Sequence, residues 1–216
     1  MPEFRNARIL VFAKAPIPGA AKTRLIPVLG TRRAAALQGA LVHHTLNTAT
    51  QSGLEVELWC HPNHLHPWFS ICATEFAIVL RDQEGADLGE RMYHAAKTAL
   101  TTAPVILIGT DCPGLTASEL REASKKLAKG YDAVLGPALD GGYYLLGLNR
   151  IHSSLFNDIS WGSDRVFIQT RQRLRALGWR WWKPSVRRDV DRPTDLAFLP
   201  PNLDAVIQGT PFGVYP

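Results

Sequence analysis

The chain has 216 residues, of which 46% are hydrophobic and 20% are charged. This composition is typical of one globular domain with a sizeable core, and no linker-like stretch divides residues 1–216. The net charge of +5 suits an anionic ligand, but the basic residues are too few and too scattered to predict binding to nucleic acid. No apolar run is long enough to predict a span across a bilayer.

Cysteine usage and the N-terminus predict the compartment. The three cysteines are odd in number and show no paired spacing, unlike the disulfide frameworks of small secreted proteins. The N-terminus enters a strand-like run at Arg8 without the apolar segment of a signal peptide. We therefore expect a cytoplasmic protein. Cys112 has no histidine near it in the sequence, which favours a small buried residue over a nucleophile.

Apolar runs of strand length alternate with helical patterns along the chain. The runs are residues 9–13, 56–60, 76–80, 105–109, 132–136 and 143–148, and the predicted helices cover 31–49, 88–99, 116–130 and 163–177. Several runs lack a polar face, which predicts strands buried on both sides in an α/β, mainly parallel sheet with helices on both faces. Ligands of such sheets bind beyond the carboxyl ends of the strands.

A basic loop follows the first of these runs. Residues 14–25 read KAPIPGAAKTRL, and the prolines together with Gly19 exclude a continuous helix. Lys14, Lys22 and Arg24 place three cations in this loop, and Gly19 allows close approach of the backbone to a ligand. The loop therefore predicts a phosphate site, with a plain solvated basic loop as the alternative.

Acidic residues follow two later runs. Asp111 leaves the run 105–109 directly into a Pro-Gly turn, where its carboxylate could hold Mg²⁺ or merely cap the turn. Asp140, Gly141 and Gly142 follow the run 132–136. Asp140 could hold hydroxyl groups of a substrate lying against the two glycines, or the three residues could form a plain hairpin turn.

Two further segments carry weaker signals. Residues 82–92 lead into a helix near Gly89 and could bind a nucleobase, or could serve only as the entry to that helix. Residues 189–196 read DVDRPTDL and contain Asp189, Asp191 and Asp195. These acids could complete a cation site with Asp111, or could cap a helix that begins at Pro193.

Six segments in order resemble one family across nearly the whole chain: FAKAPIPGAAKTRL, DLGERM, GTDCPGL, GPALDGGYYLLGL, ISWGSDRVFIQT and DVDRPTDL. The chain resembles the glycosyltransferase-A-like family of selenodomain-associated or arsenosugar-biosynthesis glycosyltransferases. That family is similar to 2-phospho-L-lactate guanylyltransferase and, more distantly, to molybdenum-cofactor guanylyltransferase. The resemblance implies a nucleotide-diphospho-sugar transferase (GT-A) fold, a divalent cation, Mg²⁺ or Mn²⁺, and phosphate binding by Gly19, Lys22 and Arg24.

The resemblance also implies a metal site. It implies that Asp111 binds the cation and that Asp191 completes the site, unless Asp189 takes that place. One departure concerns the reaction. Many glycosyltransferases of this fold carry an Asp-x-Asp sequence, whereas residues 110–113 read TDCP, which looks more like a nucleotidylyltransferase.

We predict a Mg²⁺-dependent transferase that uses a nucleotide donor and a small-molecule acceptor. Lys22, Arg24, Asp111 and Asp140 are its predicted catalytic residues, acting by positioning and electrostatics. The family name favours glycosyl transfer from a nucleotide-diphospho-sugar. Nucleotidylyl transfer, which releases pyrophosphate from an NTP, is the alternative, and a non-catalytic nucleotide-binding protein is the second. The nucleobase, the acceptor and the oligomeric state do not follow from the sequence.

Two substitution effects are expected at this stage. Lys22→Ala or Arg24→Ala should weaken nucleotide binding and leave the fold intact, since both side chains are expected on a surface loop. Asp111→Asn should leave thermal stability nearly unchanged, because asparagine keeps the turn-forming ability of aspartate, or raise it slightly by relieving repulsion between carboxylates. It should abolish the Mg²⁺-dependent part of nucleotide binding.

Overall fold

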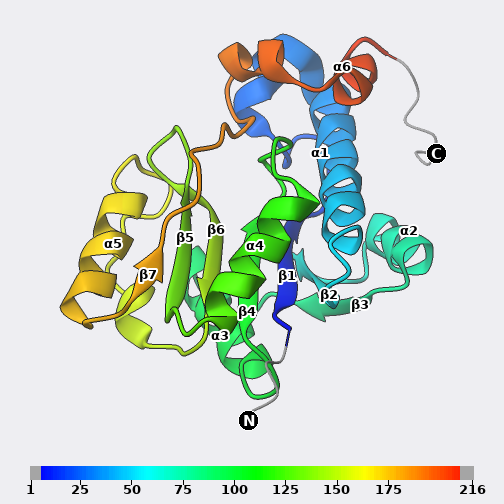
Figure 1. The fold of residues 1–216 in the computed structure, drawn as a ribbon. Helices are drawn as coiled ribbons and strands as arrows, with labels where there is room; N and C mark the ends of the chain where they lie inside the picture. The colour runs from blue at the N-terminus through cyan, green and yellow to red at the C-terminus, as the bar shows by residue number, and fades with distance from the viewer. Residues whose placement is uncertain (1–5, 210–216) are drawn as a thin grey trace.

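The strand-like runs assemble into one seven-stranded sheet in the computed structural model, which describes residues 6–209 (Figure 1). The strand order across the sheet is β3-β2-β1-β4-β6-β5-β7. The strands are β1 (Arg8–Lys14), β2 (Val56–His61), β3 (Val79–Asp82), β4 (Val105–Gly109), β5 (Ala133–Pro137), β6 (Tyr143–Leu148) and β7 (Trp181–Trp182).

Only β6 runs against the other strands of this sheet. β1 pairs in parallel with β2 and β4, β2 with β3, and β5 with β7, whereas β6 is antiparallel to both β4 and β5. The reason is the short turn of residues 138–142 between β5 and β6, because so few residues can join only antiparallel neighbours. The predicted mainly parallel sheet is confirmed, and the hairpin reading of this turn is correct.

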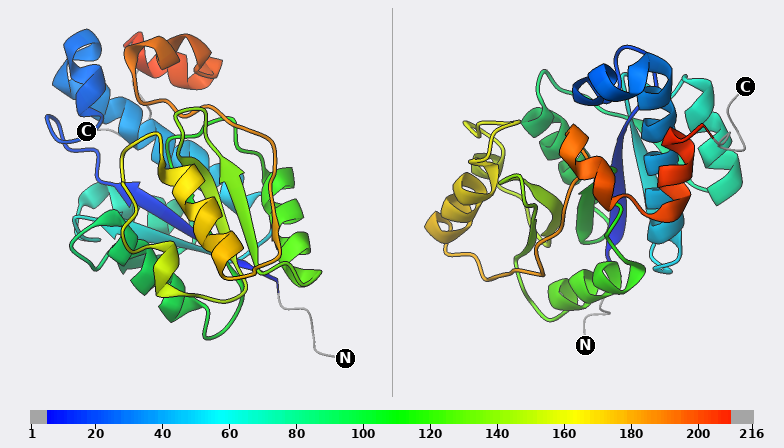
Figure 2. Two further views of the ribbon diagram at one scale, coloured as in Figure 1. Left: turned by 90° about the vertical axis from the view of Figure 1, so that its left-hand side faces the viewer. Right: turned by 90° about the horizontal axis from the view of Figure 1, so that it is seen from above.

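Helices cover both faces of the sheet, as the two further views in Figure 2 show. One face packs against the helices α1 (Ile26–Thr50), α2 (Pro67–Phe76) and α4 (Ala117–Ala128), and the other against α3 (Leu88–Ala99) and α5 (Val166–Ala176). The helix α6 (Pro201–Ile207) packs with α1 and the short helix η1 (Thr23–Leu25) in a third apolar cluster. The remaining short helices are η2 (Ser153–Leu155) and η3 (Pro193–Phe198).

Local signals fix several helix ends. Thr116 and Glu119 form a capping box at the start of α4, where the sequence predicts a helix to begin. Gly30 is non-helical inside α1, so the regular part of that helix begins where the sequence predicts. The segment 76–80, predicted as a strand, is divided between the end of α2 and the start of β3. The helix α2 was not predicted from the sequence, although Pro67 occupies a first-turn position where proline is favoured.

The chain returns late to the carboxyl edge of the sheet. Residues 183–192 run from β7 past the β5–β6 turn, where Ala138 forms an isolated bridge with Arg187. The Val190 N–H then donates a hydrogen bond of 2.7 Å to the Asp111 carbonyl. This backbone contact places Asp189 and Asp191 beside the end of β4. Within residues 6–209, no helix is long and apolar enough to cross a membrane.

Gly141 and Gly162 provide a matched test of this packing. Both have positive φ, +89° and +78°, but a Cβ on Gly141 would lie 2.2 Å from the Asp164 carbonyl oxygen, whereas one on Gly162 meets nothing within 4 Å. We expect Gly141→Ala to lower the free energy of unfolding by about 3 kcal/mol or more, through backbone strain plus the clash. Gly162→Ala should cost about 1 kcal/mol from strain alone. Equal losses in urea denaturation would contradict the proposed packing of the turn on Asp164.

Candidate active site

Five of the residues predicted from the sequence surround one cavity at the carboxyl edge of the sheet. The cavity has a volume of about 410 Å³ and lies between the loop after β1, the end of β4 and the late segment 189–191. Its charged lining consists of Lys14, Lys22, Arg24, Asp111 and Asp191. We call it the polar cavity. Residues far apart in sequence meet here because the ends of β1 and β4 are neighbours in the sheet.

Lys22 is buried, contrary to the expectation of a surface loop. Its side chain is only 3% exposed, and its backbone has the left-handed φ of 48°, which is uncommon for a residue with a side chain. The ammonium group contacts Asp111 Oδ1 at 2.7 Å and donates to the Val190 carbonyl at 2.7 Å. Lys22 therefore ties the loop to β4 and to the late segment, so its substitution should affect the fold as well as the ligand.

The other two cations of the loop stand at the rim of the polar cavity. Lys14 is exposed at the end of β1, and Arg24 forms an ion pair with Asp191. Gln38 of α1, which the sequence analysis did not identify, donates to the Lys14 carbonyl at 3.2 Å. The signal that could have identified Gln38 from the sequence is a polar residue on the buried side of α1. These contacts hold the loop while leaving cationic groups at the cavity.

Asp189 is the acid in this region with an unsatisfied buried oxygen. Its Oδ1 is buried and has no hydrogen-bond partner. Burial, together with the nearby carboxylates of Asp140, Asp111 and Asp191, raises the pKa of Asp189 to about 7, against the lowering effect of Lys22. Several negative charges therefore converge on this point without enough positive charge to balance them.

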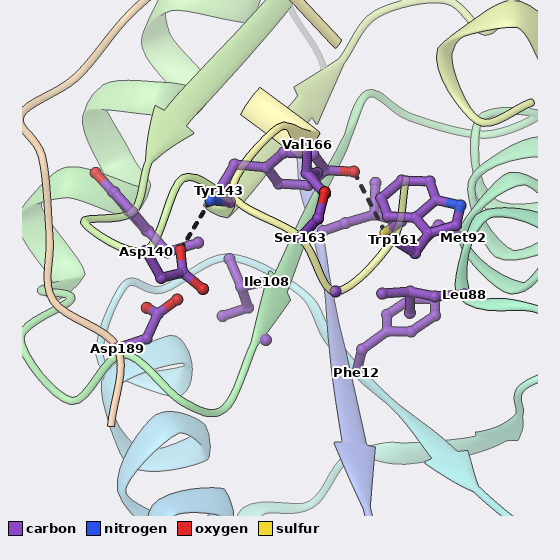
Figure 3. Close-up of a pocket in the computed structure, with 15 residues that line it drawn as sticks. Phe12, Leu88, Met92, Ile108, Asp140, Tyr143, Trp161, Ser163, Val166 and Asp189 are labelled. Atoms are coloured by element: carbon purple, nitrogen blue, oxygen red, sulfur yellow. Dashed lines mark hydrogen bonds between the residues drawn. The ribbon is translucent and has the colours of Figure 1, made fainter. Parts of the chain in front are cut away.

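A second cavity, mostly apolar, lies on the other side of the β4 end. It has a volume of about 190 Å³ and is lined by aromatic and aliphatic side chains, with Asp140 and Asp189 as its charged residues. Figure 3 shows these two carboxylates side by side at one end and Phe12, Leu88 and Trp161 toward the other. We call it the apolar cavity. The walls of this cavity were not predicted from the sequence, because buried apolar residues look like ordinary core in a sequence.

The predicted glycines have different environments. Gly142 lines the apolar cavity, in agreement with a position next to a substrate. Gly141 does not, because the backbone of Asp164 occupies the space beside it. Gly89 also faces protein, since a Cβ there would lie 2.6 Å from the Phe156 carbonyl oxygen. The predicted nucleotide contact of Gly89 is therefore corrected to a packing role for α3.

Gly19, the remaining predicted glycine, lies in the exposed turn of the basic loop. Its φ is +84°, and no atom lies within 4 Å of a Cβ placed on it. The positive φ explains glycine at this position in the turn. Cys112 is buried, and burial raises the pKa of its thiol to about 12, in agreement with a core residue and not a nucleophile.

Within residues 6–209, no three His, Cys, Asp or Glu side chains form a ready-made metal cage. Mg²⁺ does not require one, because it commonly takes one or two carboxylates together with phosphate oxygens and water. Asp191 is engaged by Arg24, whereas the buried oxygen of Asp189 is without a partner. The residues therefore fit a divalent cation held by Asp111 together with either Asp191, which lines the same cavity, or Asp189.

Comparison with known proteins places the chain in a family. Residues 45–163, more than half of the chain, match the bacterial family DUF2064, described as "Uncharacterized protein conserved in bacteria". The chain belongs to the DUF2064 family. A candidate nucleotide-diphospho-sugar transferase from Desulfovibrio desulfuricans G20 is 30% identical to it and has the same fold, with a TM-score of 0.80 over 94% of this chain and 96% of that one.

Two other proteins similar to this DUF2064 protein, one in sequence and one in fold alone, are named as nucleotidylyltransferases. Phosphoenolpyruvate guanylyltransferase from Roseiflexus castenholzii is 28% identical over 130 residues, which span 59% of this chain and 58% of that relative. The inositol-1-phosphate CTP transferase from T. maritima shares the fold at 14% identity, with a TM-score of 0.60 over 98% of both chains. The predicted fold and the resemblance to guanylyltransferases are confirmed. The relatives and structural neighbours are transferases, which confirms the predicted enzyme class.

Replacing Lys22 tests whether its buried contacts with Asp111 and Val190 stabilise the fold. Lys22→Ala leaves the Val190 carbonyl and Asp111 without the ammonium group, so we expect a loss of about 2 kcal/mol in the free energy of unfolding. Lys14→Ala removes an exposed lysine of the same cavity and should change stability by no more than about 0.5 kcal/mol. Guanidinium denaturation of both variants measures the difference. A Lys22→Ala protein as stable as the Lys14→Ala protein would show that the contacts of Lys22 do not stabilise the fold.

Replacing Asp189 tests the crowding of negative charge. Because its pKa is raised from 3.8 to about 7, the folded protein binds more protons than the unfolded chain between these values. Ionised Asp189 therefore lowers stability as the pH rises through this window. Asp189→Asn should raise the free energy of unfolding by about 4 kcal/mol at pH 8, and by progressively less toward pH 4. Thermal unfolding across this range, without divalent cations, measures the effect. The exposed Asp164→Asn serves as control and should show no such trend.

Proposed function

We propose that this protein is a Mg²⁺-dependent nucleotidylyltransferase, which transfers a nucleotidyl group from an NTP to a small acceptor and releases pyrophosphate. The observation that carries the proposal is the pairing of two adjoining cavities with opposite chemistry. The polar cavity carries the cations of the basic loop, and the apolar cavity offers walls for a second molecule. Both are lined by Phe12, Leu88 and Gly109, so a donor and an acceptor would meet at the end of β4.

The polar cavity suits the phosphates of the donor. Lys14 and Arg24 lie at its rim, and Lys22 has a third N–H besides the two that Asp111 and Val190 engage. Such donors stabilise the charge that develops on a leaving pyrophosphate. Lys22 has a second role, since it holds Asp111 at the cavity. The main contribution of these residues to the reaction would be positioning and electrostatic stabilisation.

The apolar cavity argues against the glycosyl transfer that the family name favours. A nucleotide-sugar donor would place its sugar beside the diphosphate, where hydroxyl groups need hydrogen-bonding partners. The neighbouring cavity offers mainly aromatic and aliphatic side chains there. The lone Asp111, followed by Cys112 and Pro113 instead of a second acid, also favours nucleotidylyl transfer. The guanylyltransferase relative supports the same reaction class.

A divalent cation fits the carboxylates at the boundary between the cavities. Asp111 and Asp189 would hold it, as the unpartnered buried oxygen of Asp189 indicates. When bound, Mg²⁺ supplies charge neutralisation for the phosphates and polarises the phosphorus under attack. The cation also offsets the repulsion between the acids. The three free cysteines, all buried, fit a protein of the reducing cytoplasm.

Thermal-shift measurements with each of the four NTPs, with and without Mg²⁺, test this function. An NTP at 100 times its Kd stabilises the protein by about 2.7 kcal/mol, which corresponds to roughly 5–10 °C for a chain of this size. We expect Asp111→Asn to abolish the Mg²⁺-dependent part of the shift, because it removes a metal-binding charge. Since Lys22 then loses its carboxylate partner, the variant should also be less stable without ligand, unlike the expectation from sequence alone.

The reaction products decide between the two transfers. Pyrophosphate released from an NTP in an acceptor-dependent manner would support the proposal. Larger thermal shifts with UDP-glucose or GDP-mannose than with any NTP, accompanied by release of UDP or GDP, would show that the protein transfers sugars. Asp164→Asn is the matched control, since it removes an exposed carboxylate that does not line the polar cavity.

A further inference from the structure

The charge of the apolar cavity points to the class of acceptor. Its lining, all within the described part of the chain, contains no lysine, arginine or histidine, and its two charged residues are Asp140 and Asp189. We propose that the acceptor is an uncharged alcohol with an apolar body, and not a phosphorylated or carboxylate-bearing molecule. This inference rests on the nucleotidylyl transfer proposed above and names the second substrate of that reaction.

The walls of the apolar cavity fit the apolar body of such a molecule. Phe12 and Leu88 line one side, and the rings of Tyr143 and Trp161 meet edge to face, with centroids 6.4 Å apart. The Tyr143 hydroxyl is directed to the Met92 sulfur at 3.7 Å, a weak acceptor, as Figure 3 shows. The volume of about 190 Å³ is below the ~300–1,000 Å³ of sites for drug-sized ligands, so a small molecule is expected.

The polar end of the cavity accepts hydrogen bonds and does not neutralise anions. Asp140 Oδ1 accepts from the Gly142 N–H at 2.8 Å, and its other oxygen accepts no hydrogen bond from the residues described. Figure 3 shows this carboxylate next to that of Asp189. A hydroxyl group can donate to Asp140, whereas a phosphate or carboxylate would meet the like charge of Asp140, with no lysine, arginine or histidine in the lining to offset it while Asp189 holds the cation. Repulsion of this kind selects against anionic molecules.

The arginines nearest to this end do not supply the missing charge. They line a neighbouring cavity in which five aspartates accompany three arginines. Two of the three are already held: Arg24 pairs with Asp191, and Arg188 contacts Asp195 at 3.4 Å. The aspartates of this neighbouring cavity outnumber its arginines, so the surroundings of Asp140 and Asp189 stay acidic.

The resulting reaction balances as transfer to an alcohol. The hydroxyl oxygen of the acceptor forms a bond to the α-phosphorus of the NTP, and the bond from this phosphorus to the bridging oxygen breaks. Pyrophosphate leaves with the electron pair of that bond. The hydroxyl proton passes to the Asp140 carboxylate and from there to water. The product is a phosphodiester, whereas a phosphorylated acceptor would yield a diphosphate. In this respect the chain differs from its relative named for phosphoenolpyruvate.

Saturation-transfer NMR with 2-phenylethanol, a neutral alcohol with an apolar ring, tests the acceptor class. We expect the alcohol to bind the wild-type protein with nuclear Overhauser contacts to the rings of Tyr143 and Trp161. Phosphoenolpyruvate should not displace it. Asp140→Asn keeps the turn and the hydrogen bond to Gly142 but removes one charge, so phosphoenolpyruvate should displace the alcohol from this variant. Asp164→Asn, which does not line this cavity, should behave like the wild-type protein, with no displacement by phosphoenolpyruvate.

These outcomes test the class of acceptor independently of the nucleotidylyl transfer. Absence of ring contacts from the alcohol, displacement by phosphoenolpyruvate in the wild-type protein, or equal effects of the two variants would overturn the proposal. These measurements need no turnover. If the alcohol binds as expected but no NTP releases pyrophosphate in its presence, the cavity assignment stands and the nucleotidylyl transfer fails.

Discussion

The site depends on one buried ammonium group. Lys22 connects the loop after β1 to Asp111 at the end of β4 and to the Val190 carbonyl in the late segment. Three pieces of chain that are distant in sequence are thereby held at one point. An ammonium group suits this task because it has three donors and no acceptor. The left-handed backbone of Lys22, which costs about 1 kcal/mol, is tolerated because these contacts offset the strain.

The two cavities beside Lys22 differ in their charged lining. Three cations and two aspartates line the polar cavity, whereas Asp140 and Asp189 face the apolar cavity without a lysine, arginine or histidine in its lining. Asp189 has a raised pKa although a lysine lies near it, because its burial and three neighbouring carboxylates outweigh that single cation. Unbalanced charge of this kind is costly in a folded protein and is typical of functional sites.

The antiparallel strand β6 makes the second cavity possible. A parallel continuation after β5 would require a crossover, whereas the short turn of residues 138–142 brings Asp140 and Tyr143 back to the carboxyl edge. Gly141 lets this turn pack on the backbone of Asp164, next to Ser163 and Trp161. The fold shared with nucleotide-diphospho-sugar and nucleotidyl transferases thus provides the platform, and the side chains of this turn and of segment 161–166 determine what fits beside the donor.

The sequence by itself determined most of the sheet, the helices around it except α2, and the chemistry at the strand ends. Unbroken apolar runs predicted a buried, mainly parallel sheet, and the prolines, glycines and charges after them predicted that Lys14, Arg24 and Asp111 would meet. Only the tertiary structure decided that Lys22 is buried and that one carboxylate oxygen of Asp189 is buried without a hydrogen-bond partner. The reason is physical: burial, ion pairing and pKa depend on which distant segments pack together, and local periodicity carries no information about those partners.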